Sequence, residues 1–143
     1  MGLPFWYDAC CISTSAYMGA IGLTCIYLDL DSLKNVGLTL LLSCVFSIWH
    51  RSLRMCSNTS MTVWALDVLA AFVMGTILFQ SLYSLSLYTQ SFYAMAAIGS
   101  ILSFLVQMRY NMCHMACALH IGAHLGMCVF VSLLTRRFVC PSV

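Results

Sequence analysis

Long apolar stretches alternate with short polar ones along the chain, and this pattern predicts five membrane-spanning helices. A helix needs about 20 mostly apolar residues to cross a bilayer. Stretches of this kind lie at residues 9–28, 36–53, 62–84, 92–107 and 113–134. They are too long for buried strands, and they lack the alternation of a membrane barrel. We therefore expect an all-α, polytopic transmembrane helix bundle that forms one domain over residues 1–143.

Basic residues mark the ends of the second, fourth and fifth stretches. These residues are Arg51, Arg54, Arg109, Arg136 and Arg137. The positive-inside rule assigns orientation from the Lys and Arg residues near the ends of the spans. With five spans and Lys34 included, the two sides carry equal numbers, so the orientation stays open.

Composition narrows the class of protein. Of the 143 residues, 62% are hydrophobic and 7% are charged, whereas a soluble domain has about 45–50% apolar and about 25% charged residues. A water-soluble globule, a disordered chain and a nucleic-acid binder are excluded on this ground. The partners to expect are membrane lipids and other membrane protein subunits, with no nucleic acid.

The cysteines and the N-terminal stretch bear on localisation. Most of the nine cysteines, Cys11 and Cys117 among them, lie in apolar runs, where we interpret them as small buried hydrophobic residues. The first residues contain no basic region and no Arg-rich amphipathic pattern, so we expect no secretory signal and no transit peptide. This favours a reducing environment and leaves the organelle open between the mitochondrial inner membrane and the endomembranes.

Four ionisable residues within the predicted spans form a candidate site, because such residues are costly in lipid. His120 and His124 lie four residues apart and share one helix face, which suits two ligands of one metal ion. His50 lies near the end of the second stretch, and Asp67 lies early in the third. At about 1.5 Å of rise per residue, the predicted topology places all four in one half of the bilayer.

Three imidazoles and one carboxylate from three helices match a catalytic zinc site with an open coordination position. In this interpretation, His50, His120 and His124 bind zinc, which lowers the pKa of a bound water to about 7. Asp67 then orients that water or accepts its proton. A simpler alternative stays open, in which each histidine only hydrogen-bonds to a neighbouring helix.

The same residues carry a resemblance to the CREST superfamily of membrane proteins. This group includes alkaline ceramidases, adiponectin-receptor-type proteins, GPI-remodelling hydrolases and myomaker-like proteins. The matching segments are SCVFSIWH at 43–50, WALDVLAAF around Asp67 and HIGAH at 120–124. The resemblance implies a zinc-dependent hydrolase of lipid amides or esters, with zinc on the three histidines and Asp67 acting beside the metal.

Two departures from the family pattern accompany this resemblance. The family has a serine one turn before its first histidine, where this chain has Phe46. Ser43 and Ser47 lie nearby but not at that spacing, and Ser47 is taken as the candidate for the catalytic serine. The family also has seven spans, whereas five are predicted here. The loss of two spans preserves the orientation of the last helix but removes part of the wall that would enclose a lipid chain.

Two other functions stay open. The first is a non-catalytic subunit of a larger membrane assembly, such as an organellar respiratory complex, which the small size and short loops favour. The second is a haem b anchor, with His50 and either His120 or His124 as axial ligands. Zinc content and the visible absorption spectrum separate these functions.

Overall fold

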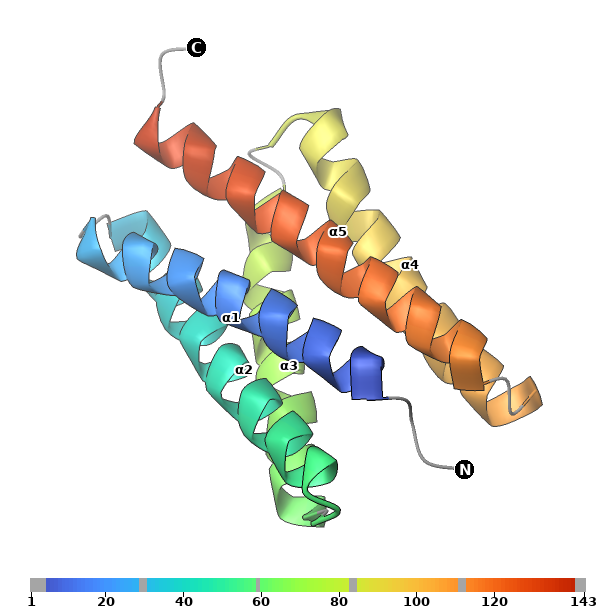
Figure 1. Cartoon of the computed structure of the whole chain (residues 1–143). Helices are drawn as coiled ribbons and strands as arrows, with labels where there is room; N and C mark the ends of the chain where they lie inside the picture. Colours follow the sequence, from blue (N-terminus) through green and yellow to red (C-terminus); the bar gives the residue numbers. More distant parts are fainter. Residues whose placement is uncertain (1–4, 29–30, 59, 83–84, 111–112, 141–143) are drawn as a thin grey trace.

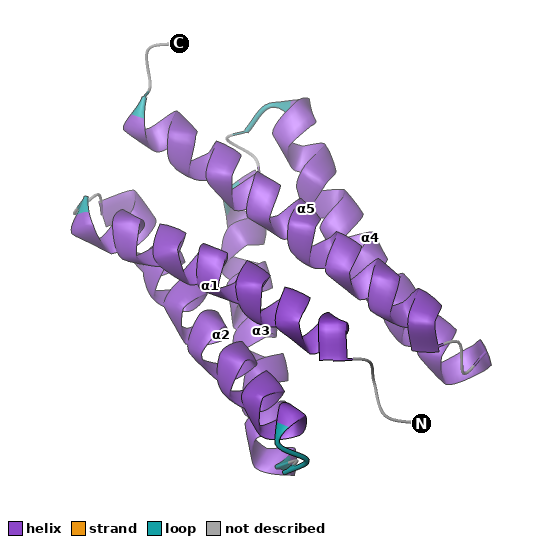
Figure 2. Ribbon diagram, in the orientation of Figure 1, coloured by secondary structure: helices purple, strands orange, loops and turns teal. Residues whose placement is uncertain are grey.

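The regular structure of the chain is helical wherever the computed structural model describes it, which covers residues 5–28, 31–58, 60–82, 85–110 and 113–140 (Figure 2). Five helices follow one another, and each corresponds to one predicted stretch, with ends that differ by a few residues. They are α1 (Phe5–Tyr27), α2 (Asp31–Met55), α3 (Met61–Gln80), α4 (Leu87–Tyr110) and α5 (Cys113–Val139). The expected all-α helical bundle is confirmed.

Four of these helices are long and apolar enough to cross a membrane. The segments that qualify are Phe5–Tyr27, Leu33–Met55, Met61–Gln80 and His114–Val139. The predicted stretch 92–107 lies in α4, whose described residues do not reach this level. The first turns of α4 carry the polar sequence YTQS, which lowers its mean hydropathy. The chain is thus a multi-pass membrane protein by length and composition of its helices, with a crossing by α4 still a prediction.

The helices form two antiparallel pairs, α1 with α2 and α4 with α5, and α3 lies behind α1 (Figure 1). Contacts between α1 and α5 join the two pairs, and α3 packs against α2. Because α1 touches both α2 and α5, residues on its buried face can meet residues from either pair.

Glycines allow α1 and α2 to approach closely. A Cβ atom at Gly22 would lie 2.8 Å from the carbonyl oxygen of Gly37, and one at Gly37 would lie 2.7 Å from that of Gly22. Small residues at such crossings let helix backbones pack directly against each other in a membrane. This crossing fixes the register between α1 and α2.

An apolar core closes the end of the bundle where α3 ends and α4 begins. Its fully buried members are Leu40, Leu78, Phe130, Val131 and Leu134. At this end the Tyr93 hydroxyl donates a hydrogen bond of 2.7 Å to the carbonyl of Gly75, which ties α4 to α3. Polar side chains gather farther along the bundle, toward the start of α3 and α5.

Candidate metal centre

A cavity of about 760 Å³ lies between the helices, and all five helices contribute to its wall. The wall includes every site residue predicted from the sequence. These residues are Ser47 and His50 of α2, Asp67 of α3, and His120 and His124 of α5. The structure therefore directs residues from three helices toward one space.

His120 and His124 point their ring nitrogens at each other from successive turns of α5. The two Nε2 atoms are 3.1 Å apart. Two nitrogens bound to one tetrahedral zinc ion, each at about 2.0–2.1 Å, lie about 3.4 Å apart. The separation in the protein is thus close to that of two ligands of one ion.

Cys11 of α1 joins this pair of histidines. The candidate ligand atoms of Cys11, His120 and His124 all lie within 4.8 Å of one another. Cys11 is a free thiol with no exposed surface. Two imidazoles and one thiol form a donor set typical of zinc, and three protein ligands leave a fourth position open.

Thr14 determines which nitrogen of His124 carries the proton. Its hydroxyl lies 3.0 Å from the carbonyl oxygen of Cys10 and 3.1 Å from that of Cys11, so its single proton is directed to these acceptors. The hydroxyl oxygen then accepts a hydrogen bond from Nδ1 of His124, at 2.9 Å. In neutral His124 the lone pair is therefore on Nε2, which faces His120.

Arg51 constrains His120 in a similar way. Its Nη2 atom lies 3.4 Å from Nε2 of His120, and a guanidinium can only donate hydrogen bonds. Nε2 of His120 is then an acceptor as well. Each imidazole nitrogen has one lone pair, so a cation bound between the two Nε2 atoms, which lie 3.1 Å apart, would replace this contact from Arg51.

His50 and Asp67 form a separate pair on the same cavity wall. Nδ1 of His50 donates to Oδ2 of Asp67 at 2.9 Å, and the two side chains are only 11% and 14% exposed. The structure thus divides the four predicted residues into two groups. His120 and His124 meet Cys11, whereas His50, the predicted third zinc ligand, is bonded to Asp67.

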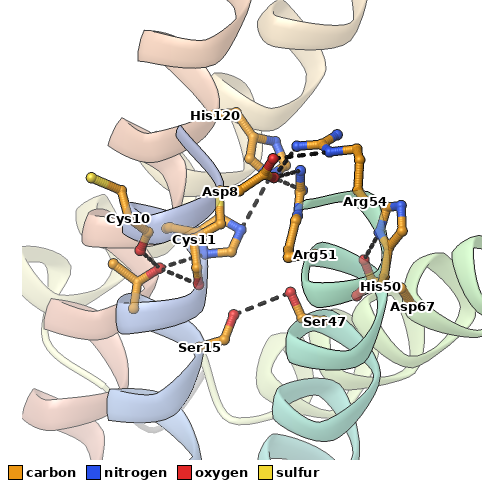
Figure 3. A network of polar contacts seen from close by, with 12 residues as sticks. Asp8, Cys10, Cys11, Ser15, Ser47, His50, Arg51, Arg54, Asp67 and His120 are labelled. Carbon is orange, nitrogen blue, oxygen red and sulfur yellow. Dashed lines mark hydrogen bonds and ion pairs between the residues drawn. The ribbon is translucent and has the colours of Figure 1, made fainter. Parts of the chain in front are cut away.

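Ser47 lies on the cavity wall but is engaged elsewhere. It is buried, and its hydroxyl accepts a hydrogen bond of 3.1 Å from the hydroxyl of Ser15 on α1. This contact holds α1 to α2 one turn below the charged residues (Figure 3). A catalytic role for Ser47 stays a prediction from the family resemblance.

A buried charged cluster was missed from the sequence. Arg51 and Arg54 were expected to end a span at the membrane surface, yet both approach Asp8, which is itself buried (Figure 3). Arg54 binds both carboxylate oxygens of Asp8, through Nε at 3.2 Å and through Nη2. Nη1 of Arg51 lies 3.5 Å from Oδ1 of Asp8. Opposite charges offset part of the cost of burial for each other, which allows these side chains to lie between the helices.

A sequence signal for Cys11 and Asp8 does exist. Asp8, Cys11 and Ser15 follow one another at helical spacing and form one face of α1, and all three are buried. The sequence alone favours packing for Cys11, because it stands with Cys10 in an apolar run, where cysteine is a common buried residue.

Comparison with known proteins finds no relative of this chain. No protein-family model, no curated protein and no solved structure matches it. The candidate metal centre therefore depends on its own geometry, and the resemblance to the CREST superfamily contributes only to the proposal below.

Proposed function

We propose that this protein is an intramembrane, zinc-dependent hydrolase of lipid amides or esters. The observation that carries the proposal is the 3.1 Å separation of the Nε2 atoms of His120 and His124 on the wall of the cavity between the helices. The resemblance to the CREST superfamily supplies the class of reaction and of substrate.

Three residues would hold the metal. His120 and His124 supply nitrogen ligands, and Cys11 supplies a sulfur ligand from α1. The Thr14 hydroxyl orients His124 from behind, as outer-shell groups do in zinc sites. When bound with an open position, zinc supplies an activated water for attack on a carbonyl carbon.

The His50–Asp67 pair supplies acid–base chemistry in this proposal. Because Nδ1 of His50 donates to Asp67, the opposite ring nitrogen, Nε2, carries a lone pair. His50 lines the cavity and can take a proton from water and pass it to the leaving group. Asp67 keeps the ring in this tautomer and stabilises its charged form.

The wall of the cavity favours a lipid substrate. Val68 and Phe72 of α3 and Ile101 of α4 line the cavity and are also 49%, 72% and 60% exposed. Because these three side chains contact both the cavity and the outer surface of the bundle, they mark an opening between α3 and α4 toward the surrounding lipid. The volume of about 760 Å³ falls within the range of about 300–1,000 Å³ of ligand pockets.

Elemental analysis of protein purified in a mild neutral detergent tests the proposal. We expect about one zinc per chain, with most of it lost in His120→Ala. His114→Ala is the matched control, since His114 lies on the same helix but is exposed. Zinc-free wild-type protein, or equal zinc in His120→Ala, would contradict the metal centre, and a Soret band would indicate haem b instead.

A substrate screen tests the hydrolase activity separately. Ceramides and lysophospholipids in mixed micelles present an amide and an ester, respectively. We expect release of fatty acid from one of the two classes and its loss in His120→Ala. Zinc bound at one ion per chain without hydrolysis of either class would leave a metal-binding protein and overturn the enzymatic part.

A further inference from the structure

Arg51 is a buried cation on the cavity wall with incomplete hydrogen bonding. The residue is 6% exposed and lines the cavity, and its Nε is a buried nitrogen with no hydrogen-bond partner. A guanidinium buried in a membrane protein is stable only when its charge and its N–H groups are paired. Arg51 meets this condition only in part: its charge faces Asp8 at 3.5 Å, and its Nε has no partner among the described residues.

The carboxylates near Arg51 are bound more closely by other groups. Asp8 accepts hydrogen bonds from Arg54 on both oxygens, and its contact with Arg51 is 3.5 Å long. Asp67 accepts a hydrogen bond of 2.9 Å from His50. Of the two arginines at Asp8, Arg51 therefore has the weaker contact with the carboxylate.

We propose that Arg51 binds an anionic group, a phosphate or a carboxylate, carried by the head of a lipid in the cavity. The planar guanidinium presents its N–H groups in a fork that matches the oxygens of both anions. The Tyr7 ring covers one face of this guanidinium, with 4.9 Å between the ring centroid and Cζ. Binding through the N–H groups that face the cavity adds an anionic partner to this guanidinium, whose Nε has none among the described residues.

The position of Arg51 relates this anion to the metal centre. Nη2 of Arg51 lies 3.4 Å from Nε2 of His120, so an anion on Arg51 lies beside the candidate metal ligands. The apolar part of the cavity, toward Phe72 and Met127, then receives the hydrocarbon chain. That the bound lipid is also the substrate, with its anionic head close to its amide or ester, rests on the proposed function. Binding of the anionic head to Arg51 does not depend on that function.

Calorimetric titration of the full chain in dodecyl maltoside tests the inference without any variant. The probes are dodecyl phosphate, dodecyltrimethylammonium with the same chain and the opposite charge, and inorganic phosphate. We expect dodecyl phosphate to bind at least tenfold more tightly than either of the others. Equal affinity of the two amphiphiles would overturn the anion site, and equal affinity of inorganic phosphate would overturn the lipid head group.

Variants assign the binding to Arg51. We expect Arg51→Met to weaken the binding of dodecyl phosphate at least tenfold, and Arg136→Met, at an exposed position near the end of α5, to leave it unchanged. Circular dichroism and gel filtration verify that each variant is folded. Unchanged affinity in folded Arg51→Met would contradict the assignment.

His120→Ala separates this inference from the proposed function. If Arg51 holds the anion, the zinc-depleted His120→Ala protein still binds dodecyl phosphate within a few-fold of the wild-type affinity. Loss of binding in this variant would place the anion on the metal and overturn the role of Arg51. A wild-type protein that binds dodecyl phosphate but contains no zinc would contradict only the proposed function.

Discussion

At the scale of single residues, the proposed metal centre depends on how a few side chains are oriented. Thr14 gives up its proton to the backbone of its own helix and so accepts the Nδ1–H of His124. Nη2 of Arg51 approaches Nε2 of His120. The Thr14 contact leaves the lone pair of His124 on Nε2, and the Arg51 contact makes Nε2 of His120 an acceptor, although neither Thr14 nor Arg51 is a candidate ligand.

Thr14→Val removes the hydroxyl that orients His124 and keeps the shape of the side chain. Loss of such an outer-shell hydrogen bond weakens metal binding about 10–100-fold. Competition with a chromogenic zinc chelator measures the change. Thr24→Val is the matched control, because the Thr24 hydroxyl only bonds to the backbone of α1. Equal affinity of Thr14→Val and the wild type would show that Thr14 does not orient a ligand.

Asp67→Asn separates the acid–base pair from the metal ligands. The amide still contacts His50 but no longer stabilises its charged form, so we expect kcat/KM for lipid hydrolysis to fall at least about 100-fold. Zinc content stays at the wild-type level, since Asp67 is not in the Cys11–His120–His124 group. A variant that loses zinc along with activity would place Asp67 among the ligands.

At the scale of helices, the site depends on α1, which links the two helix pairs. Its buried face carries Asp8, Cys11 and Ser15 toward the polar end of the bundle and Gly22 toward the close crossing with α2. The close crossing thus sets the position along the bundle at which Cys11 meets α5. A shift of α1 on α2 would move Cys11 relative to both histidines.

Gly22→Ala tests the crossing. The added Cβ would lie 2.8 Å from the carbonyl oxygen of Gly37, and overpacking of this kind costs about 1–3 kcal/mol. The matched control is Gly122→Ala, where a Cβ meets nothing within 4 Å and alanine raises helix stability by about 0.5–1 kcal/mol. Thermal unfolding in detergent compares the two. A lower melting temperature for Gly122→Ala than for Gly22→Ala would contradict the tight crossing.

The helices were predictable from the sequence, whereas several of their ends were not. Long apolar runs locate all five helices, because the length needed to cross a bilayer is a strong constraint. The third predicted stretch ends at residue 84, but α3 ends at Gln80, where the N–H of the cap residue Ser81 bonds back to Leu78. Arg51 lies in the interior because it meets Asp8, a contact between helices that no local pattern contains.

At the scale of the whole molecule, one end of the bundle is packed with apolar side chains and the rest surrounds a cavity. The histidine pair was predictable from its i, i+4 spacing, and its placement near His50 and Asp67 followed from the topology. Cys11 was not predictable in the same way. Its role requires α1 to pack against α5 across more than a hundred residues of sequence, and cysteine is also a common packing residue.

Metal removal should loosen the whole bundle, because Cys11 and the two histidines would tie α1 to α5 through the ion. Ligands that bind only the folded state stabilise it, by about 2.7 kcal/mol at a concentration of 100 Kd. We therefore expect a chelator to lower the melting temperature of the wild type and to leave that of His120→Ala unchanged. An identical melting temperature of the wild type with and without chelator would show that no metal couples these helices.

Zinc K-edge X-ray absorption on the purified wild-type protein tests the central claim most directly. The proposed centre predicts two nitrogen ligands at about 2.0–2.1 Å, one sulfur at about 2.3 Å and one further light atom. In Cys11→Ser the sulfur contribution should disappear while the nitrogen ligands remain. A shell of oxygen and nitrogen without sulfur in the wild type, or the absence of bound zinc, would contradict a centre built from Cys11, His120 and His124.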